Sequence, residues 1–296
     1  WQLFDDAWTT VPEHAGCAFG YPARFGPAFL KDARSAMDAA LRACRTGVER
    51  RRVRMHDDAL EQFELFMKLR RDLAEGRLRT LRRFATTWFD TQRALGDRYE
   101  RQYAFGKVPW TDETVGGRYF KAFFEPAYLE ATRFAETASW VSPPVPAWRH
   151  AVDEARRGES LGWAKADFDD AGWKSTDPRG ETWSALGLDT WYGPVFYRAT
   201  VDIPAPAEGG KTFLWIASTD GDAKVFVNGR PVRWAGERGK PRDVFSGYCQ
   251  PASFDVTRVA RAGANQVTIV GTRTAINELG TGGLIGPVYI YQQGPP

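Results

Sequence analysis

The stretch WYGPVFYRATVDIPAPAEGGKTFLWIASTDGDAKVFVNG, from Trp191 to Gly229, decides the fold of the second half of the chain. It contains three short runs of β-branched and aromatic residues, at 195–203, 213–216 and 225–227, each followed by residues that favour turns. The last run ends at Asn228-Gly229, a dipeptide that readily forms a tight hairpin turn. This alternation predicts antiparallel strands joined by turns.

Similar runs continue to the C-terminus, with little helical periodicity between them. They lie at 231–234, 253–256, 265–272 and 287–291. Many short strands separated by turn residues are typical of an antiparallel β-sandwich, in which two sheets enclose a core. We therefore expect residues 148–296 to form a β-sandwich.

The first half of the chain has the periodicity of helices. Apolar residues recur every three or four positions in four segments, which are 27–47, 48–75, 78–103 and 119–134. The short joins at Gly47 and Gly76 favour antiparallel neighbours. Residues 27–138 are therefore predicted to form an antiparallel helical bundle.

Two further segments complete the predicted organisation. Residues 1–26 combine aromatic residues with Gly and Pro, so we expect an irregular lead-in that packs against a neighbour. Residues 139–147 contain three prolines, which favour an extended and stiff path, and are predicted to link the helices to the sandwich. At 296 residues the chain is long enough for two domains with cores of their own.

The charge balance argues against a nucleic-acid partner, and the length of the apolar runs argues against a membrane span. The net charge of +3 comes from 40 basic and 37 acidic side chains, which gives no general electrostatic attraction to nucleic acid. Only Glu49–Arg54 is densely basic, and without interleaved aromatic residues it is interpreted as a solvated helix start. No apolar run approaches the roughly 18 residues of a membrane-spanning helix. We expect neither a nucleic-acid partner nor a membrane span.

Cysteine and histidine are too sparse for a metal motif or a disulfide scaffold. Cys17, Cys44 and Cys249 lack short spacings, and we interpret them as small apolar thiols, with a Cys17–Cys44 bridge as the alternative. The three histidines are equally scattered. The chain begins at Trp1 without a basic segment followed by an apolar one, so no signal peptide is visible and we expect a fragment or a processed chain.

Five motifs follow one another in the second half of the chain. They are DFDDAGW (167–173), GPVFYRATVDIP (193–204), DAKVFVNG (222–229), FDVT with GANQVTI (254–257 and 263–269), and GGLIGPV (282–288). In this order they resemble the motifs of galactose-binding-like jelly-roll domains that accompany many glycoside hydrolases, especially the sugar-binding domain of the β-galactosidase type. The resemblance implies a jelly-roll fold with carbohydrate as the ligand.

The helical half resembles the helical region that follows the catalytic barrel in large bacterial glycosidases of the α-glucuronidase-like kind. Only the pattern of amphipathic helices carries this second resemblance. Together the two imply the C-terminal, non-catalytic portion of a polysaccharide-degrading enzyme, whose partner is an upstream catalytic domain of the same polypeptide. They also favour a secreted, cell-surface or periplasmic location.

No catalytic constellation is visible in the sequence, so the candidate site residues are those suited to sugar binding. A sugar ring needs an aromatic face for its C–H side and planar polar groups for its hydroxyls. The candidates are Trp191, Tyr192, Trp234, Tyr248, Arg273, Asn277 and Glu278. For each aromatic residue the alternative interpretation is packing at an edge of the sandwich or at the contact between domains.

An acidic loop raises the question of a metal ion. Asp167, Asp169 and Asp170 lie too close together to flank a glycosidic bond, which needs two carboxyl groups roughly 5 to 9.5 Å apart. They could hold Ca²⁺, with an Asp-rich turn as the alternative, and no other cofactor is expected.

Two alternative functions stay open. One is a structural or cell-surface interaction protein without a glycan ligand. The other is a glycosidase in its own right, using Glu278 and a partner that the sequence does not reveal.

Overall fold

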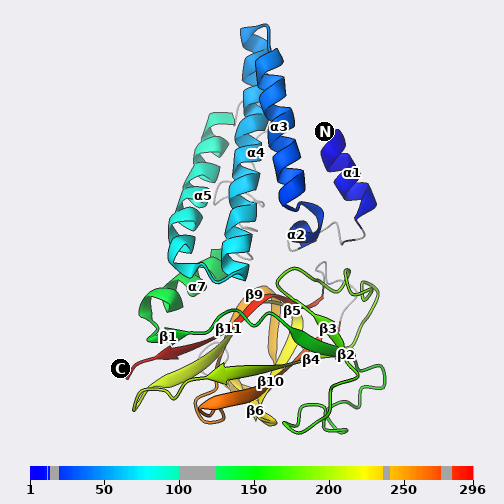
Figure 1. Cartoon of the computed structure of the whole chain (residues 1–296), viewed down its shortest axis with the longest axis vertical. Helices are drawn as coiled ribbons and strands as arrows, with labels where there is room; N and C mark the ends of the chain where they lie inside the picture. Colours follow the sequence, from blue (N-terminus) through cyan, green and yellow to red (C-terminus); the bar gives the residue numbers. More distant parts are fainter. Residues whose placement is uncertain (12, 14–19, 100–124, 236–240, 275–281, 296) are drawn as a thin grey trace.

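A layer of helices lies on a curled antiparallel sheet, giving a mixed α/β structure (Figure 1). The computed structural model describes residues 1–11, 13, 20–99, 125–235, 241–274 and 282–295. Within these ranges, no helix combines the length and the hydrophobicity needed to cross a membrane.

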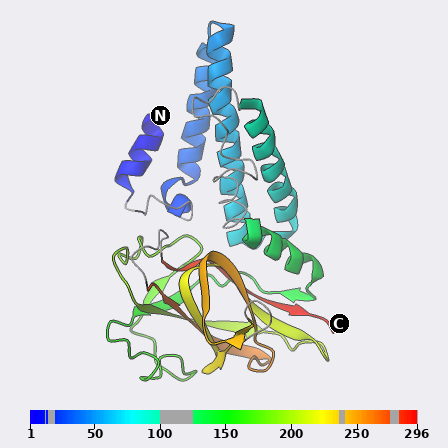
Figure 2. The same ribbon diagram turned by 180° about the vertical axis from the view of Figure 1, so that it is seen from behind.

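The helices come first in the chain. Their bounds are α1 (Gln2–Thr10), α2 (Tyr21–Arg24), α3 (Pro27–Ala43), α4 (Gly47–Ala74), α5 (Leu78–Tyr99) and α7 (Glu125–Thr137). Helices α3, α4 and α5 alternate in direction and lie side by side (Figures 1 and 2). The helical segments predicted from 27 to 99 are confirmed, while residues 100–124 lie outside the described part of the chain.

Local chemistry sets the two ends of the long helix α4. Its start is a capping box, in which Thr46 Oγ1 accepts the Glu49 N–H at 3.1 Å and Glu49 Oε2 accepts the Thr46 N–H at 3.0 Å. Hydrogen bonds from the backbone N–H groups of Arg45 and Thr46 lower the pKa of Glu49. The helix ends before Gly76, whose φ of +78° is a conformation that glycine adopts without a steric penalty.

The prediction that residues 1–26 are irregular is wrong for Gln2–Thr10, which forms α1. Phe4, Ala7 and Trp8 recur at helical spacing. Phe4 and Trp8 pack against the buried ring of Phe25, at 5.6 and 5.9 Å between ring centres. The helix-breaking Pro and Gly residues of this segment begin only after α1, so they do not interrupt it.

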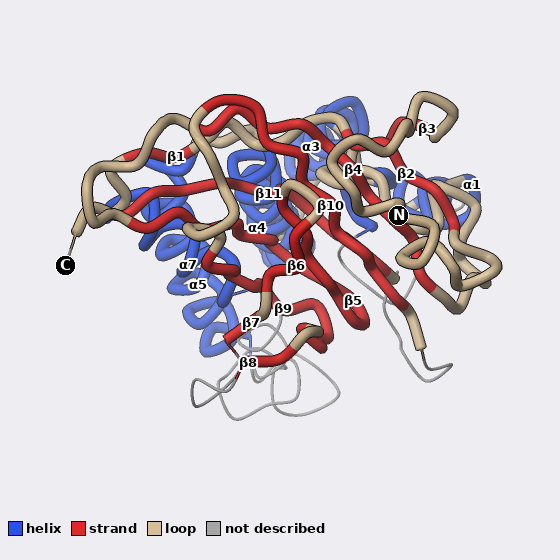
Figure 3. Tube along the Cα trace, turned by 90° about the horizontal axis from the view of Figure 1, so that it is seen from below, coloured by secondary structure: helices blue, strands red, loops and turns tan. Residues whose placement is uncertain are grey.

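The sheet is antiparallel throughout the described strands, as the sequence predicts. The strands are β1 (Trp140–Val141), β2 (Trp148–Val152), β3 (Lys174–Thr176), β4 (Pro194–Ile203), β5 (Lys211–Val227), β6 (Arg230–Val232), β7 (Trp234–Ala235), β8 (Pro241–Arg242), β9 (Phe245–Asp255), β10 (Gly263–Thr272) and β11 (Gly283–Gln293). The main sheet has the order β1-β11-β5-β10-β4-β2-β3, with β6 and β9 on the other edge of β5, and β7 pairs with β8. Figure 3 shows the sheet with the helices behind it.

Strand β5 joins the two halves of the curled sheet. Its residues 211–220 pair with β11 and its residues 222–227 pair with β10 on the same edge. The switch falls at Gly221, which has a φ of +98° and lies so close to Thr272 that a Cβ there would be 2.4 Å from the Thr272 carbonyl oxygen. Only glycine fits this junction. The turn predicted at Asn228-Gly229 is confirmed, with positive φ at both residues between β5 and β6.

The sheet has a hydrophobic core on each face. The core on the inner face of the curl includes Tyr197, Ile216 and Ile290. The outer face presents Trp215, Tyr289 and Tyr291, which belong to the same core as the buried residues of α4, α5 and α7. The helices and the outer face of the sheet therefore share one hydrophobic core.

Specific contacts hold the helices on the outer face. The Phe134 ring of α7 stacks on Tyr291 with 4.8 Å between ring centres and 8° between planes. Trp215 Nε1 donates to Glu130 Oε2 at 2.7 Å. The Tyr289 hydroxyl donates to the carbonyl of Leu73 near the end of α4, and burial raises the pKa of Tyr289.

The proline-rich segment 139–147 is extended, as its composition suggests, and it is hydrogen-bonded to the sheet. Its residues 140–141 form β1 and pair with β11. Ser142 N–H donates to the Ile290 carbonyl at 2.8 Å and Val145 N–H to the Val288 carbonyl at 3.1 Å. The segment thus runs along β11, and the domain boundary placed there stays a prediction.

Replacing Gly221 with alanine tests the junction in β5. The new Cβ would clash with the Thr272 carbonyl and the backbone would keep a positive φ, so we expect a loss of about 2–4 kcal/mol in the free energy of unfolding. Thermal unfolding followed by circular dichroism measures this loss. Gly172→Ala is the control, because a Cβ at Gly172 meets no atom within 4 Å. Equal melting temperatures for the two variants would contradict the conclusion that the junction in β5 requires glycine at position 221.

Candidate functional site

Three of the predicted sugar-binding residues meet at one end of the curled sheet. Pairing sets this arrangement, because Thr272 at the end of β10 lies opposite Pro194 of β4 on one side and Asp222 of β5 on the other. Trp191 and Tyr192 immediately precede β4, and Arg273 immediately follows β10. We call the group Trp191, Tyr192, Asp222 and Arg273 the loop-end cluster.

Arg273 holds the turn before β4 against the end of β10. Its guanidinium carbon lies 4.7 Å from the centre of the Tyr192 ring, a cation–π arrangement. Its Nη1 donates to the Asp189 carbonyl at 3.0 Å, and its backbone N–H donates to the Gly193 carbonyl at 3.4 Å. The Arg273 side chain is buried, so it positions Tyr192 from below the surface.

Trp191 is half-buried beside this turn. Its indole packs so closely over Gly193 that a Cβ on that glycine would lie 2.7 Å from Trp191 Cζ2. The ring also contacts the core on the inner face. Its indole nitrogen is buried, and no acceptor for it exists among the described residues. Part of the ring remains at the surface, where it can contact the apolar face of a sugar.

Asp222 adds a carboxylate that the sequence interpretation treated only as part of a strand motif. Its Oδ1 accepts the Ser246 hydroxyl at 2.5 Å, across the edge between β5 and β9. A half-buried carboxylate held in this way can accept further hydrogen bonds from sugar hydroxyls. The sequence signal that could have indicated Asp222 is its place in the turn-forming run STDGD (218–222). At this run, strand β5 changes from pairing with β11 to pairing with β10.

Trp234 is not part of the loop-end cluster, and the side chains of the remaining predicted site residues are outside the described part of the structure. Trp234 lies on the β9 side of β5, where its ring packs against Phe245 at 4.9 Å between centres. The backbone of Tyr248 pairs with Asp220 in the sheet, and its side chain is outside the described part of the structure. Asn277 and Glu278 also lie outside the described residues, so their roles stay predictions.

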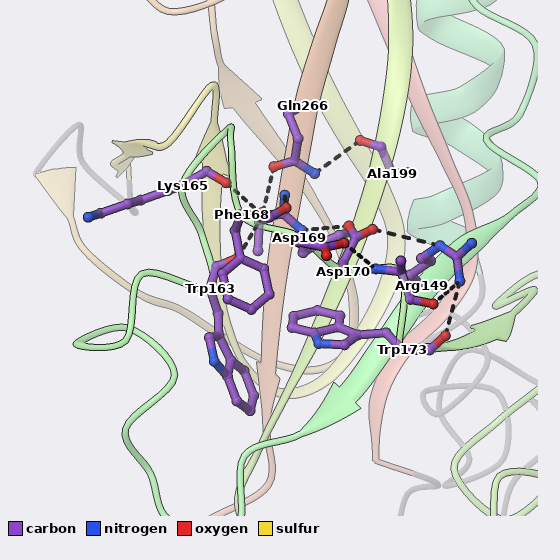
Figure 4. Close-up of polar contacts among 12 residues, drawn as sticks. Arg149, Trp163, Lys165, Phe168, Asp169, Asp170, Trp173, Ala199 and Gln266 are labelled. Carbon is purple, nitrogen blue, oxygen red and sulfur yellow. Dashed lines mark hydrogen bonds and ion pairs between the residues drawn. The ribbon is translucent and has the colours of Figure 1, made fainter.

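A buried arginine organises the first of the five sequence motifs (Figure 4). Arg198 of β4 is 2% exposed, and its Nε donates to Asp170 Oδ2 at 2.7 Å. Its Nη1 donates to the carbonyls of Trp163 and Lys165 at 2.6 and 3.0 Å, and its Nη2 to that of Phe168 at 3.2 Å. One side chain therefore fixes the loop from 163 to 170 on the sheet.

Two of the aspartates of this loop, Asp169 and Asp170, have local partners. Asp169 Oδ1 accepts the Ala171 N–H at 2.9 Å, and Asp170 lies between Arg198 and Arg149, the latter at 3.7 Å. No group of three or more His, Cys, Asp or Glu side chains in the described ranges is placed to hold a metal ion. These contacts are those of an Asp-rich turn, and the calcium hypothesis stays a prediction. Cys44 and Cys249 are free thiols, while Cys17 lies outside the described residues.

Comparisons with known proteins give only a partial likeness. No protein-family model matches the chain, and no curated protein matches it. Among solved structures, it is similar to a β-glucuronidase from Bacteroides uniformis, with 18% identity and a TM-score of 0.40 over 52% of this chain and 18% of that one. A β-glucuronidase from Ruminococcus gnavus has 17% identity and a TM-score of 0.39 over 54% of this chain and 32% of that one.

A glycosyl hydrolase family 2 member from Bacteroides cellulosilyticus has 20% identity and a TM-score of 0.39 over 51% of this chain and 20% of that one. The chain thus spans less than a third of the length of each of these three proteins. At these identities and TM-scores, the likeness assigns neither a family nor an activity to this chain.

Arg198→Met tests the role of the buried arginine. The variant leaves the Asp170 carboxylate and three carbonyls without their donor, so we expect a loss of about 3–5 kcal/mol in the free energy of unfolding. Urea unfolding measures the loss, and limited proteolysis shows whether the 163–170 loop is released. Arg149→Met is the matched control, because Arg149 is half-exposed, and it should cost no more than about 1 kcal/mol. Equal losses of unfolding free energy in the two variants would contradict the conclusion that Arg198 holds the 163–170 loop on the sheet.

Proposed function

We propose that this chain is a non-catalytic portion of a glycoside hydrolase, with a galactose-binding-like jelly-roll domain that binds carbohydrate at the loop-end cluster. The helices form an antiparallel bundle that supports this domain beside a catalytic domain of the same polypeptide. The enzyme acts outside the cytoplasm, where polysaccharides are found. The five sequence motifs and the geometry of the cluster support the proposal.

The observation that carries the proposal is the convergence of aromatic and polar groups at one end of the sheet. Trp191 and Tyr192 come from the turn before β4, and Asp222 comes from the middle of β5. Arg273 fixes the Tyr192 ring, so little side-chain entropy is lost when a ligand binds there. Aromatic rings and a carboxylate at the same end of a sheet are groups that sugar recognition uses.

The structural roles of the motif residues favour binding over catalysis. Asp170 and Arg198 pair with each other, and the Asn228 amide donates to Asn265 Oδ1 at 2.8 Å and to the Val259 carbonyl at 2.9 Å. Gly283 lies against the Trp183 indole so closely that a Cβ would be 2.2 Å from its nitrogen. These groups hold turns and strands together, so they are not available as acid, base or nucleophile.

A structural role without a glycan ligand is the second candidate, and one feature favours it. An apolar cavity of about 530 Å³ lies between α1, α3 and α4, lined by residues such as Phe4, Met37 and Leu60. Trp1, also at this cavity, is 89% exposed. Exposed apolar surface of this kind is typical of a contact with another protein or domain.

Glycan binding by variants of the loop-end cluster tests the proposal. We expect the chain to bind oligosaccharides on a glycan array, and Trp191→Ala and Tyr192→Ala to weaken binding of the best glycan at least about tenfold, because each removes an apolar contact face. Isothermal titration calorimetry measures the change. Trp8→Ala on α1 is the control and should bind like the unmodified chain, because Trp8 lies on a different element.

Two other outcomes would contradict the proposed function and favour one of the alternative functions. An array without any bound glycan would contradict carbohydrate binding and favour the structural role. Hydrolysis of aryl glycosides that Glu278→Gln abolishes would contradict the non-catalytic role and support a glycosidase.

A further inference from the structure

The join between α3 and α4 is a projecting tip with a high density of positive charge (Figures 1 and 2). Residues 42–54 contain six arginines and one glutamate, a net charge of +5. The whole chain has a net charge of only +3, so all other residues together carry −2. We call this segment the arginine tip, and its arginines are Arg42, Arg45, Arg50, Arg51, Arg52 and Arg54.

The charge of the arginine tip is exposed and largely unneutralised. All six arginines are exposed to solvent. Within the described residues, Arg54 alone among them has a carboxylate partner, Asp57 at 3.0 Å, and Asp57 also binds Arg34 at 2.6 Å. The carboxylate of Glu49 is engaged by the N–H groups at the start of α4. Five guanidinium groups are therefore left to solvent or to a ligand.

This concentration of like charge opposes folding. Arg50 and Arg54 are four residues apart on one face of α4, a spacing at which like charges destabilise a helix. A helix tip needed only for solubility would intersperse both signs of charge. A bound polyanion would relieve the repulsion, and the projecting position leaves the arginines accessible to a long polymer (Figure 2).

We infer that the arginine tip binds an anionic polysaccharide that carries uronate carboxylates along its chain. Guanidinium groups bind carboxylates through two parallel hydrogen bonds and remain charged at any physiological pH. Repeated carboxylates on one polymer match repeated arginines on one tip. The choice of a glycan as the polyanion rests on the proposed function, whereas the charge of the tip is independent of it.

Two other polyanions fit the arginine tip less well. Helices that bind lipid surfaces insert an apolar face. Among the described residues of this tip, Val48 is the one large hydrophobic side chain that is exposed. Proteins that bind single-stranded nucleic acid stack bases on aromatic rings, and residues 42–54 contain no aromatic residue.

Affinity electrophoresis in gels with polygalacturonate or with neutral dextran tests the inference. We expect the chain to be retarded by polygalacturonate only, and Arg50→Gln/Arg51→Gln/Arg52→Gln to bind about tenfold more weakly, because three charged contacts are lost. The capping box at Thr46 is untouched, so helicity by circular dichroism should not change. About 0.5 M NaCl should remove the retardation of the unmodified chain.

A second triple variant controls for net charge. Arg79→Gln/Arg230→Gln/Arg258→Gln removes the same charge at exposed sites on α5, β6 and the loop after β9. It should be retarded like the unmodified chain. Equal weakening in both triple variants would overturn the inference.

The remaining outcomes separate this inference from the proposed function. Retardation by polygalacturonate that persists in Trp191→Ala but is lost in the tip variant supports the arginine tip whether or not the loop-end cluster binds sugar. Loss in Trp191→Ala with retention in the tip variant overturns the inference and leaves the proposed function standing. Binding to phosphatidylserine vesicles or single-stranded DNA as strong as to polygalacturonate, and lost in the tip variant, would also overturn it.

Discussion

The structure depends on covering the outer aromatic face of the sheet. Trp215, Tyr289 and Tyr291 alternate with inner-face residues along β5 and β11, and all three are buried under the helices. A fully buried aromatic side chain removes roughly 150–250 Å² from water, worth up to about 4–6 kcal/mol at 25 cal/mol per Å². Without the helices this face would be an apolar patch, so the helical layer is a structural requirement of the sheet.

The same sheet determines where the loop-end cluster lies. Because β5 changes partner from β11 to β10 at Gly221, the next residue, Asp222, lies beside the end of β10. Arg273 then reaches back to the turn before β4 and fixes Tyr192. The candidate site is thus a product of strand register, and a disturbance of the β5 junction would displace its members from one another.

Much of the fold could be predicted from local sequence pattern. Apolar spacing predicted α3, α4 and α5, and Asn228-Gly229 predicted the tight turn after β5, because these features depend on neighbouring residues. The curl and the helical cover could not be predicted, because they depend on pairing between distant residues. One available signal was the uninterrupted run FLWI at 213–216, in which apolar side chains occur on both faces of a strand.

The site was predictable only in part. Trp191, Tyr192 and Arg273 were candidates by residue type, but their proximity depends on the register between β4 and β10. Asp222 and Arg198 each stand within a strand motif, and their roles depend on Ser246 and Asp170, which are distant in the sequence. Long-range hydrogen bonds of this kind leave no periodic trace in a sequence.

The most direct test of the shared core is urea unfolding followed by two probes at once. Far-UV circular dichroism reports mainly the helices, and near-UV dichroism reports the packed aromatic residues of the sheet. If helices and sheet share one core, both signals change in a single transition with the same midpoint. Two separate transitions, with the helices unfolding while the sheet keeps its aromatic signal, would contradict the account.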